Sequence, residues 1–303
     1  ANENFALTSI HTVWARNHNY HVEKLVESGF TGTEEELFQS AKIVNEAEYQ
    51  RVVFKEYTDY LIGGLKGNGD HGHDEYNPEV NGQISHEFAA AAFRFGHSQI
   101  GQTITVLDEN GDPKSVNLVD AFLNPTSDAS AFGGDGRLVQ LAGMGYVPQP
   151  GYEQLGVNNI IGGIVRQQAE EVDFNVVDAV RNDLVRLRAD LFAFNVARGW
   201  DLGLGTLNQV RAGLVASTDK YVSEAAAFSG ADLTPYRSWE DFKARNSLPE
   251  TVLAQFKQAY PDLVLQTQAE IDALTAANPD IVLVNGNTVK GVDRVDLWVG
   301  GLA

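Results

Sequence analysis

The spacing of apolar residues predicts four long helices. Apolar side chains recur at helical spacing over residues 7–27, 33–65, 80–100 and 175–199. The apolar face is formed in the first helix by Leu7, Ile10, Trp14 and Leu25, and in the last by Leu184, Leu187, Leu191 and Phe194. Thr33 and Glu36 have the spacing of a capping box, which predicts the start of the second helix.

The other segments are predicted to be short or irregular. Shorter helical patterns lie near residues 205–214, 238–244, 249–259 and 268–277. Residues 101–150 contain several turn sequences with little periodicity, and residues 63–78 read as a glycine-rich loop. The segments "DIVLVNG" and "VDLWVGG" fit either short strands or buried helical turns. With no internal repeat, the sequence predicts one mainly α domain over residues 1–303, with long irregular loops and little β structure.

Composition and charge narrow the classes of partner and chemistry. Hydrophobic residues make up 43% of the 303 residues, which is enough for a sizeable core. The net charge of −19 argues against nucleic acid and anionic membranes as partners. The absence of cysteine excludes disulfides, thiolate metal sites and cysteine nucleophiles. No run of about 18 apolar residues predicts a membrane span.

An arginine and a histidine interrupt the apolar run "EFAAAAFRFGHSQI". Arg94 and His97 are three residues apart and would be neighbours on a helix, on the face that also carries Glu87. The small residues 89–92 would let a flat partner or another helix approach closely. The pattern fits haem, because a neutral imidazole ligates iron and an arginine can pair with a propionate. It also fits a core histidine beside an arginine at a helix end.

A second polar residue on an apolar face is Asn195, four positions after Leu191. A buried amide needs hydrogen-bond partners. Its carbonyl oxygen could accept from the Nδ1–H of a metal-bound histidine, a contact that fixes the tautomer of the ligand. It could equally be an ordinary buried asparagine near a helix end. Arg198 could serve a propionate or be solvated.

Two other groups of polar residues have an ordinary and a metal-binding interpretation. His11, His18 and His21 share the face of the first predicted helix, where a zinc site would still need a further ligand and a water. Hydrogen-bonded core histidines are the simpler reading. The loop "GNGDHGHDE" could hold a cation, but it lacks the spacing of a calcium-binding loop and fits a surface insertion.

Five segments in order resemble one family. They are "ANENFALTSIHTVWARNHNYHVEKL", "AKIVNEAEYQRVVFKEYTDYLIG", "YNPEVNGQISHEFAAAAFRFGHSQI", "DLFAFNVARGWDLGLGTLNQVR" and "VDRVDLWVGGLA". Together they resemble the animal-type haem peroxidases of the peroxidase–cyclooxygenase superfamily, in their bacterial branch. The resemblance implies a haem-peroxidase-like helical domain that binds haem b.

The resemblance also assigns roles. It implies that His97 is the proximal ligand of the haem iron and that Asn195 hydrogen-bonds its other ring nitrogen. Arg94 would pair with a haem propionate, and Arg198 is a further candidate for cofactor binding. Glu3 matches a glutamate that forms an ester to a haem methyl group in some members. Arg94 and Asn195 are thus the candidate catalytic residues.

This sequence also departs from the family pattern. Trp200 and Leu202 stand where the family has an arginine and a histidine, which puts propionate pairing near Trp200 in doubt. The distal arginine, the distal histidine and the calcium loop of the family would lie before Ala1. The chain is therefore expected to be a fragment, incomplete at both ends, that carries the proximal side and has the missing distal segment as its partner.

The expected function is a haem-dependent peroxidase. It would use hydrogen peroxide to oxidise a small substrate such as a halide, a phenol or Mn(II), in a secreted, extracellular or periplasmic bacterial protein. The isolated chain would then be inactive if the distal side is essential. Two alternatives stay open: a non-catalytic domain used for adhesion or assembly, and a haem-dependent fatty-acid dioxygenase.

Overall fold

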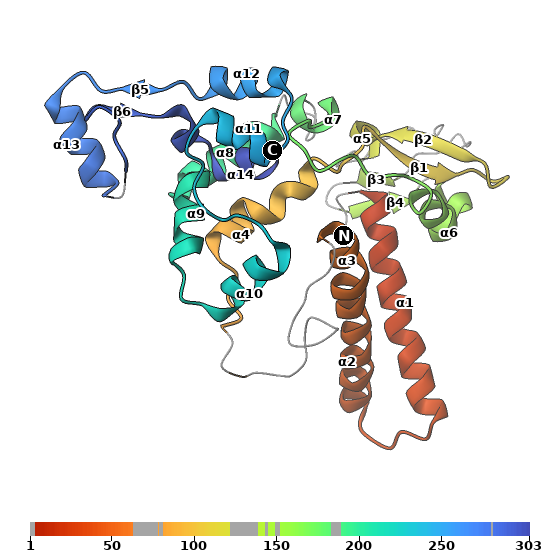
Figure 1. The fold of residues 1–303 in the computed structure, drawn as a ribbon. Helices are drawn as coiled ribbons and strands as arrows, with labels where there is room; N and C mark the ends of the chain where they lie inside the picture. Colours follow the sequence, from red (N-terminus) through yellow and green to blue (C-terminus); the bar gives the residue numbers. More distant parts are fainter. Residues whose placement is uncertain are drawn as a thin grey trace. The chain divides into compact units, whose positions relative to one another are not determined.

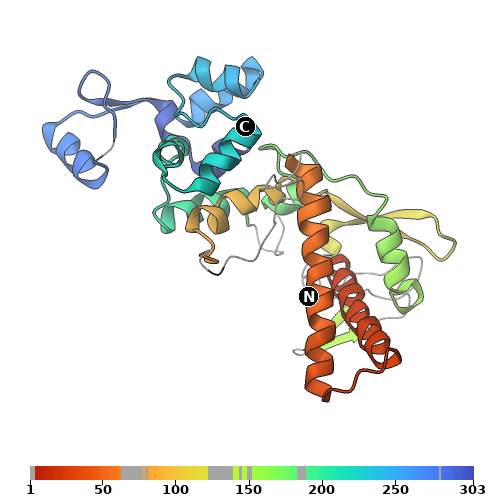
Figure 2. The same cartoon turned by 60° about the horizontal axis from the view of Figure 1, so that its bottom comes forward.

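The computed structural model describes residues 4–62, 78, 81–121, 139–142, 145–148, 152–182, 189–279 and 281–303 (Figure 1). They form two compact units. Unit 1 comprises residues 1–77, 100–170 and 177–191, and unit 2 comprises residues 78–99, 171–176 and 192–303. Figure 2 shows the same elements from another side. None of the described helices is long and apolar enough to cross a membrane.

Unit 1 begins with a helical hairpin. Helix α1 (Phe5–Glu27) packs along α2 (Glu34–Val52), as both views show. A π-helical turn (Val53–Tyr57) and the short α3 (Thr58–Ile62) continue α2. The predicted helices 7–27 and 33–65 are thus confirmed within the described residues.

The predicted capping box at the start of α2 is also confirmed. Glu36 N–H donates to Thr33 Oγ1 at 3.2 Å, and Thr33 N–H donates to Glu36 Oε2 at 2.7 Å. These contacts satisfy two backbone N–H groups that have no partner inside the helix. They also hold the pKa of Glu36 below its usual value.

A β-hairpin occupies part of the region that was expected to hold only turns. Strands β1 (Thr103–Leu107) and β2 (Pro113–Asn117) pair antiparallel, and the turn between them is the expected "DENGDP". The side chains of Val106 and Val116 are buried, and β1 packs against helix α6 (Tyr152–Ile164). A Cβ at Gly163 would lie 2.3 Å from Thr105 O, so glycine is what lets α6 approach the strand.

The rest of unit 1 is made of short elements. They are α5 (Leu118–Ala121), β3 (Val139–Ala142), β4 (Gly145–Pro148) and α7 (Asp178–Asn182). Strands β3 and β4 form a second antiparallel pair. The expected glycine-rich loop 63–78 lies outside the described residues, except for residue 78.

In unit 2, the two segments that carry the site differ from their predictions. The predicted helix 80–100 is the short α4 (His86–Ala90) followed by a 3-10 helix (Ala92–His97). The break is at Ala91, whose φ and ψ of −130° and −70° are not helical. The predicted helix 175–199 was wrong as one element: residues 189–190 are not helical, and α8 runs from Leu191 to Asp201. Leu184 and Leu187 lie outside the described residues.

The predicted shorter helices of unit 2 are confirmed with small shifts. They are α9 (Leu207–Ala216), α11 (Trp239–Arg245), α12 (Glu250–Ala259) and α13 (Gln268–Ala277). Helix α10 (Lys220–Ser229) and the two-residue strands β5 (Leu263–Val264) and β6 (Thr288–Val289) were not expected. The mainly α class with little β structure is confirmed.

The core of unit 2 lies between α9, α11, α12 and α14 (Leu297–Gly301). The segment "VDLWVGG" is a buried helical turn rather than a strand, and a Cβ at Gly300 would meet Leu207 at 2.6 Å. An aromatic cluster around Phe242 and Phe256, with ring centroids 5.1 Å apart, fills the space between α11 and α12. Helix α14 therefore packs closely against α9, and it also contacts the 3-10 helix that carries His97.

Candidate functional site

The 3-10 helix presents Arg94 and His97 on one side. Side chains three residues apart eclipse one another in such a helix. The buried Ala90 and Ala91 anchor its start, and the buried Ser98 follows its end. Ser98 Oγ accepts from the backbone N–H of Asp173 at 3.3 Å. The geometry therefore follows from the break at Ala91 and does not require a continuous α-helix.

Asn195 joins these two side chains from α8. Its side chain is only 1% exposed. Asn195 Nδ2 lies 2.9 Å from His97 Nδ1, and Asn195 Oδ1 accepts from an Arg94 guanidinium N–H at 3.2 Å. Arg94 Nε also donates to the backbone oxygen of Ala89 at 3.2 Å. The three residues singled out in the sequence thus form one hydrogen-bonded group.

The direction of the amide differs from the expectation. One of the two interpretations of the sequence had the carbonyl oxygen of Asn195 accept from a histidine Nδ1–H. Arginine can only donate, so Asn195 Oδ1 faces Arg94 and the amide nitrogen is left to face the ring. The amide therefore donates to His97 Nδ1, which acts as the acceptor.

The surroundings keep His97 neutral. Burial lowers the pKa of His97, and the nearby positive charge of Arg94 lowers it further. A neutral imidazole is the form that ligates a metal. The other ring nitrogen, Nε2, makes no hydrogen bond to any residue that the structure describes. The ring is thus held at Nδ1, and Nε2, which carries the proton of the neutral ring, has no partner among the described residues.

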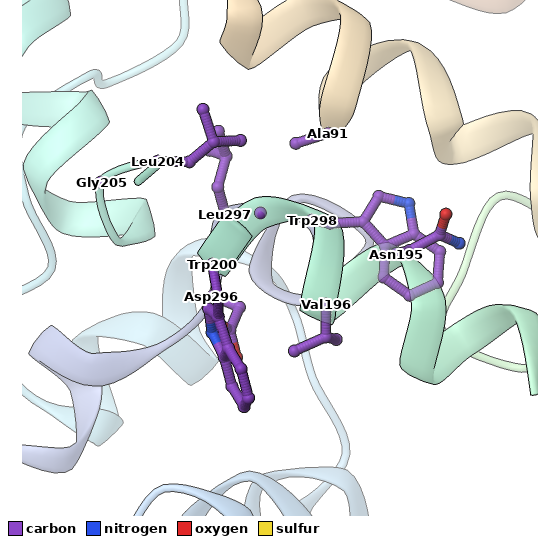
Figure 3. A pocket seen from close by; sticks show the side chains of 10 residues that line it. Ala91, Asn195, Val196, Trp200, Leu204, Gly205, Asp296, Leu297 and Trp298 are labelled. Carbon is purple, nitrogen blue, oxygen red and sulfur yellow. The ribbon is translucent and has the colours of Figure 1, made fainter. Parts of the chain in front are cut away.

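A small pocket lies beside Asn195 (Figure 3). Its walls include Ala91, Trp200, Asp296 and Trp298. Trp298 is 4% exposed, and its indole N–H has no hydrogen-bond partner in the described part of the chain. A buried donor without a partner is uncommon in folded proteins. The wall of this pocket therefore contains a buried N–H group without a partner among the described residues.

Comparison with known proteins identifies the family. The family model "Animal haem peroxidase" matches residues 1–280. This chain belongs to the animal haem peroxidase family. The mouse peroxidasin homolog is 29% identical over 238 residues, and peroxinectin A of Dictyostelium discoideum is 24% identical over 309 aligned positions. The alignment with the mouse protein covers 77% of this chain and 14% of that protein. The alignment with peroxinectin A covers 100% of this chain and 43% of that protein, so this chain spans less than half of either relative.

A solved peroxidase has the same fold. Peroxidase A from Dictyostelium discoideum aligns with a TM-score of 0.67 and 23% identity. The alignment covers 99% of this chain and 44% of that protein. Both comparisons agree with the resemblance to haem peroxidases in the sequence.

Arg198, a predicted cofactor residue of this peroxidase-family chain, is not joined to the group. Arg198 is exposed, and no described residue forms a hydrogen bond or ion pair with its guanidinium. Glu3 lies outside the described residues. Their roles stay predictions from the resemblance.

The histidines of α1 link it to α2 instead of gathering around a metal. His18 Nε2 lies 3.2 Å from the backbone oxygen of Phe38, and His21 Nε2 lies 2.9 Å from Glu48 Oε2. His11 is exposed. In the described part of the chain, no group of three or more histidine and acidic residues could hold a metal ion. The loop "GNGDHGHDE" lies outside that part.

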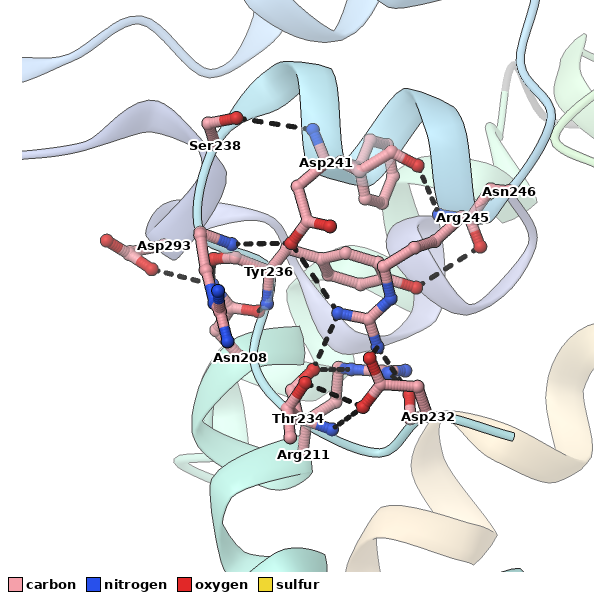
Figure 4. Close-up of polar contacts among 12 residues, drawn as sticks. Asn208, Arg211, Asp232, Thr234, Tyr236, Ser238, Asp241, Arg245, Asn246 and Asp293 are labelled. Atoms are coloured by element: carbon pink, nitrogen blue, oxygen red, sulfur yellow. Dashed lines mark hydrogen bonds and ion pairs between the residues drawn. The ribbon is translucent and has the colours of Figure 1, made fainter. Parts of the chain in front are cut away.

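Asn208 and Arg211, both on α9, contact the segment that leads into α11 (Figure 4). Asn208 Nδ2 donates to the backbone oxygen of Tyr236 at 3.0 Å, and Asn208 Oδ1 accepts from the Tyr236 N–H at 2.8 Å. Arg211 and Arg245 each lie 4.4 Å from the centre of the Tyr236 ring. Both arginines also donate to the backbone oxygen of Asp232. These contacts fix the segment that enters α11.

Sequence reasoning missed the polar contacts beside the pocket. Trp200 Nε1 donates to Asp296 Oδ1 at 2.6 Å, and the Tyr260 hydroxyl donates to Asp296 Oδ2 at 2.7 Å. Burial and the bond to Asp296 raise the pKa of Tyr260 well above its usual value, so its hydroxyl keeps its proton. Two separate signals were present in the sequence: the unusual tryptophan at position 200 and the aspartate of "VDLWVGG", which is Asp296.

Proposed function

We propose that this chain carries the proximal side of a haem peroxidase site, with His97 as the iron ligand. The observation that carries the proposal is the buried Asn195, which holds His97 Nδ1 and leaves Nε2 unengaged. Bound haem b would supply an iron that reacts with hydrogen peroxide and then takes electrons from a small reducing substrate. This fits the family to which the chain belongs.

Asn195 would strengthen the ligand. An amide that donates to His97 Nδ1 requires that this nitrogen carry no proton of its own. A neutral ring that accepts at Nδ1 carries its proton on Nε2, so binding iron through Nε2 would release that proton and leave an imidazolate, which is a stronger electron donor than a neutral imidazole. The orientation of Asn195 depends on Arg94, since Arg94 occupies the carbonyl oxygen. Arg94 would thus position the partner of the ligand.

Arg94 can hold the amide and a propionate together. A guanidinium carries five N–H groups in a planar fork. One N–H contacts Asn195 Oδ1 and another contacts the oxygen of Ala89, so further N–H groups remain for a carboxylate. Arg198 and an ester through Glu3 remain secondary proposals for holding the haem.

The finer assignments follow from the resemblance. We propose one peroxidase domain, made from both units, that works with the family's distal arginine, distal histidine and calcium loop. We also propose a secreted, extracellular or periplasmic protein of the bacterial branch, with a halide, a phenol or Mn(II) as substrate. The relatives described above are eukaryotic. The alternatives are a haem-free adhesion or assembly domain and a fatty-acid dioxygenase.

A haem-binding experiment tests the ligand assignment. The full 303-residue chain is titrated with haem, and its Soret absorbance is compared with that of His97→Ala and of His86→Ala, a control at the exposed start of α4. We expect His97→Ala to lose the ligated spectrum and free imidazole to restore it, because the small molecule can fill the site of the lost ring. An unchanged spectrum of His97→Ala would falsify the assignment. A wild-type chain that binds no haem would favour the non-catalytic alternative.

A further inference from the structure

An exposed indole that donates to a carboxylate lies at the end of α8. Trp200 is 69% exposed, although such large apolar rings are usually well covered. Its N–H donates to Asp296 Oδ1 at 2.6 Å, a short charge-assisted hydrogen bond. The other oxygen of Asp296 is held by the Tyr260 hydroxyl at 2.7 Å. The carboxylate is therefore fixed in place beside an indole that solvent reaches.

This indole lies close to the partner of His97. Asn195 and Trp200 are five residues apart on the same helix, which corresponds to about 7.5 Å along the axis. Both residues line the same pocket. A short path through α8 thus connects the group that holds His97 to the surface.

We propose that Trp200 is a surface site of one-electron oxidation for aromatic reductants too large to reach the haem. The inference rests on the proposed function, which supplies the oxidant. The indole would give one electron to the oxidant that bound haem supplies, and the indole proton would pass to Asp296 Oδ1. A phenol at the surface then returns one electron to the indole, Asp296 returns the proton to the indole nitrogen, and the phenol releases its own proton to water.

The charge of the chain selects among reductants. The net charge of −19 and the carboxylate under the indole disfavour anions at this site. Neutral or cationic phenols and aromatic amines are the class that fits, and their rings can stack on the exposed indole. A halide is an anion without a ring to stack on the indole, so this site would not favour its binding.

The first test needs no haem. The full 303-residue chain is oxidised by photochemically generated ruthenium(III) tris-bipyridine with a radical spin trap, and adducts are located by peptide mass spectrometry. We expect adducts at Trp200 to exceed those at Trp14, which contacts the Tyr49 ring instead of a carboxylate. Asp296→Asn leaves an amide oxygen but a poor proton acceptor, so adducts at Trp200 should fall. Equal labelling of the two tryptophans, or an undiminished yield in Asp296→Asn, would overturn the proposal.

The second test uses the haem-loaded chain. The ratio of turnover with a bulky aromatic dye to turnover with a small phenol is compared in Trp200→Phe and Trp14→Phe. We expect this ratio to fall about tenfold in Trp200→Phe, a barrier change of about 1.4 kcal/mol, and to stay constant in Trp14→Phe. An unchanged ratio in Trp200→Phe would refute the surface site. If the chain binds no haem, the proposed function fails by itself, and the photochemical result still decides whether Trp200 and Asp296 form a redox pair.

Discussion

Two histidines of this chain each meet a side chain from a distant helix, in very different surroundings. In unit 1, His21 contacts the exposed carboxylate of Glu48 at 2.9 Å. In unit 2, His97 contacts the buried amide of Asn195 at the same distance, with Arg94 on the other side of that amide. Burial and the nearby arginine lower the pKa of His97, so its surroundings differ from those of His21 although the two contacts have the same length.

The largest expected effect comes from removing the buried amide. Asn195→Leu would leave His97 Nδ1 and an Arg94 N–H without their partner. Unsatisfied polar groups of this kind cost about 1–3 kcal/mol, so the free energy of unfolding should fall by that amount. Urea denaturation of the full chain measures it.

The control for that change is Gln255→Leu, at an exposed position of α12. It makes the same kind of replacement without breaking the His97 group, so it should leave the free energy of unfolding nearly unchanged. If the free energy of unfolding fell by similar amounts in the two variants, the buried hydrogen bonds of Asn195 would contribute nothing to stability.

A smaller effect should follow when His97 receives the kind of partner that His21 has. Asn195→Asp places a carboxylate beside the ring and should raise the pKa of His97, because the negative charge favours the protonated imidazole. An NMR titration of the imidazole signals measures the shift, and the signal of His21 serves as an internal control. A pKa of His97 that did not rise would contradict the role given to the amide.

The comparison also separates what the sequence predicts from what it does not. Helix α13 was expected at residues 268–277 and lies there, and α2 begins after Thr33 as predicted. These helices have local signals, because a capping threonine and a regular apolar face both lie within the segment itself.

The site depends on irregularities that local signals do not reveal. Alanine is the best helix former, yet the predicted helix 80–100 breaks at Ala91. The direction of the Asn195 amide depends on Arg94, which is 101 residues away in sequence. The contact of Trp200 with Asp296 likewise spans 96 residues. The contact of Asn195 with His97 was predicted through the family resemblance, whereas the contact of Arg94 with Asn195 was not, because it depends on tertiary packing.

The pH dependence of stability offers a third prediction. Because the pKa of His97 is lowered from 6.5 in the folded chain, the unfolded chain binds more protons just below pH 6.5. Stability should therefore fall as pH drops below 6.5, by less than about 1.4 kcal/mol per pH unit. His97→Gln should remove this part of the slope, and His86→Gln should keep it. Unfolding curves at several pH values test this, and an identical slope in His97→Gln would rule it out.

The smallest effect is expected at the other histidine pair. The side chain of Glu48 is 47% exposed, and ion pairs in such places contribute little because water and salt screen them. Hydrogen bonds from His21 and then Asn17 lower the pKa of Glu48 from 4.5. The stabilisation is therefore present above pH 4.5 and is lost as pH falls below it.

Glu48→Gln should destabilise the chain slightly at neutral pH and low salt, and the difference from wild type should shrink at high salt and at acidic pH. Glu23→Gln, at an exposed position of α1, controls for the loss of one negative charge from a chain that already carries an excess. A loss in Glu48→Gln as large as that in Asn195→Leu would show that burial does not separate the two histidines. Both contacts measure 2.9 Å. The difference between the two losses of unfolding free energy therefore reports what burial and the arginine contribute, and not a difference in hydrogen-bond length.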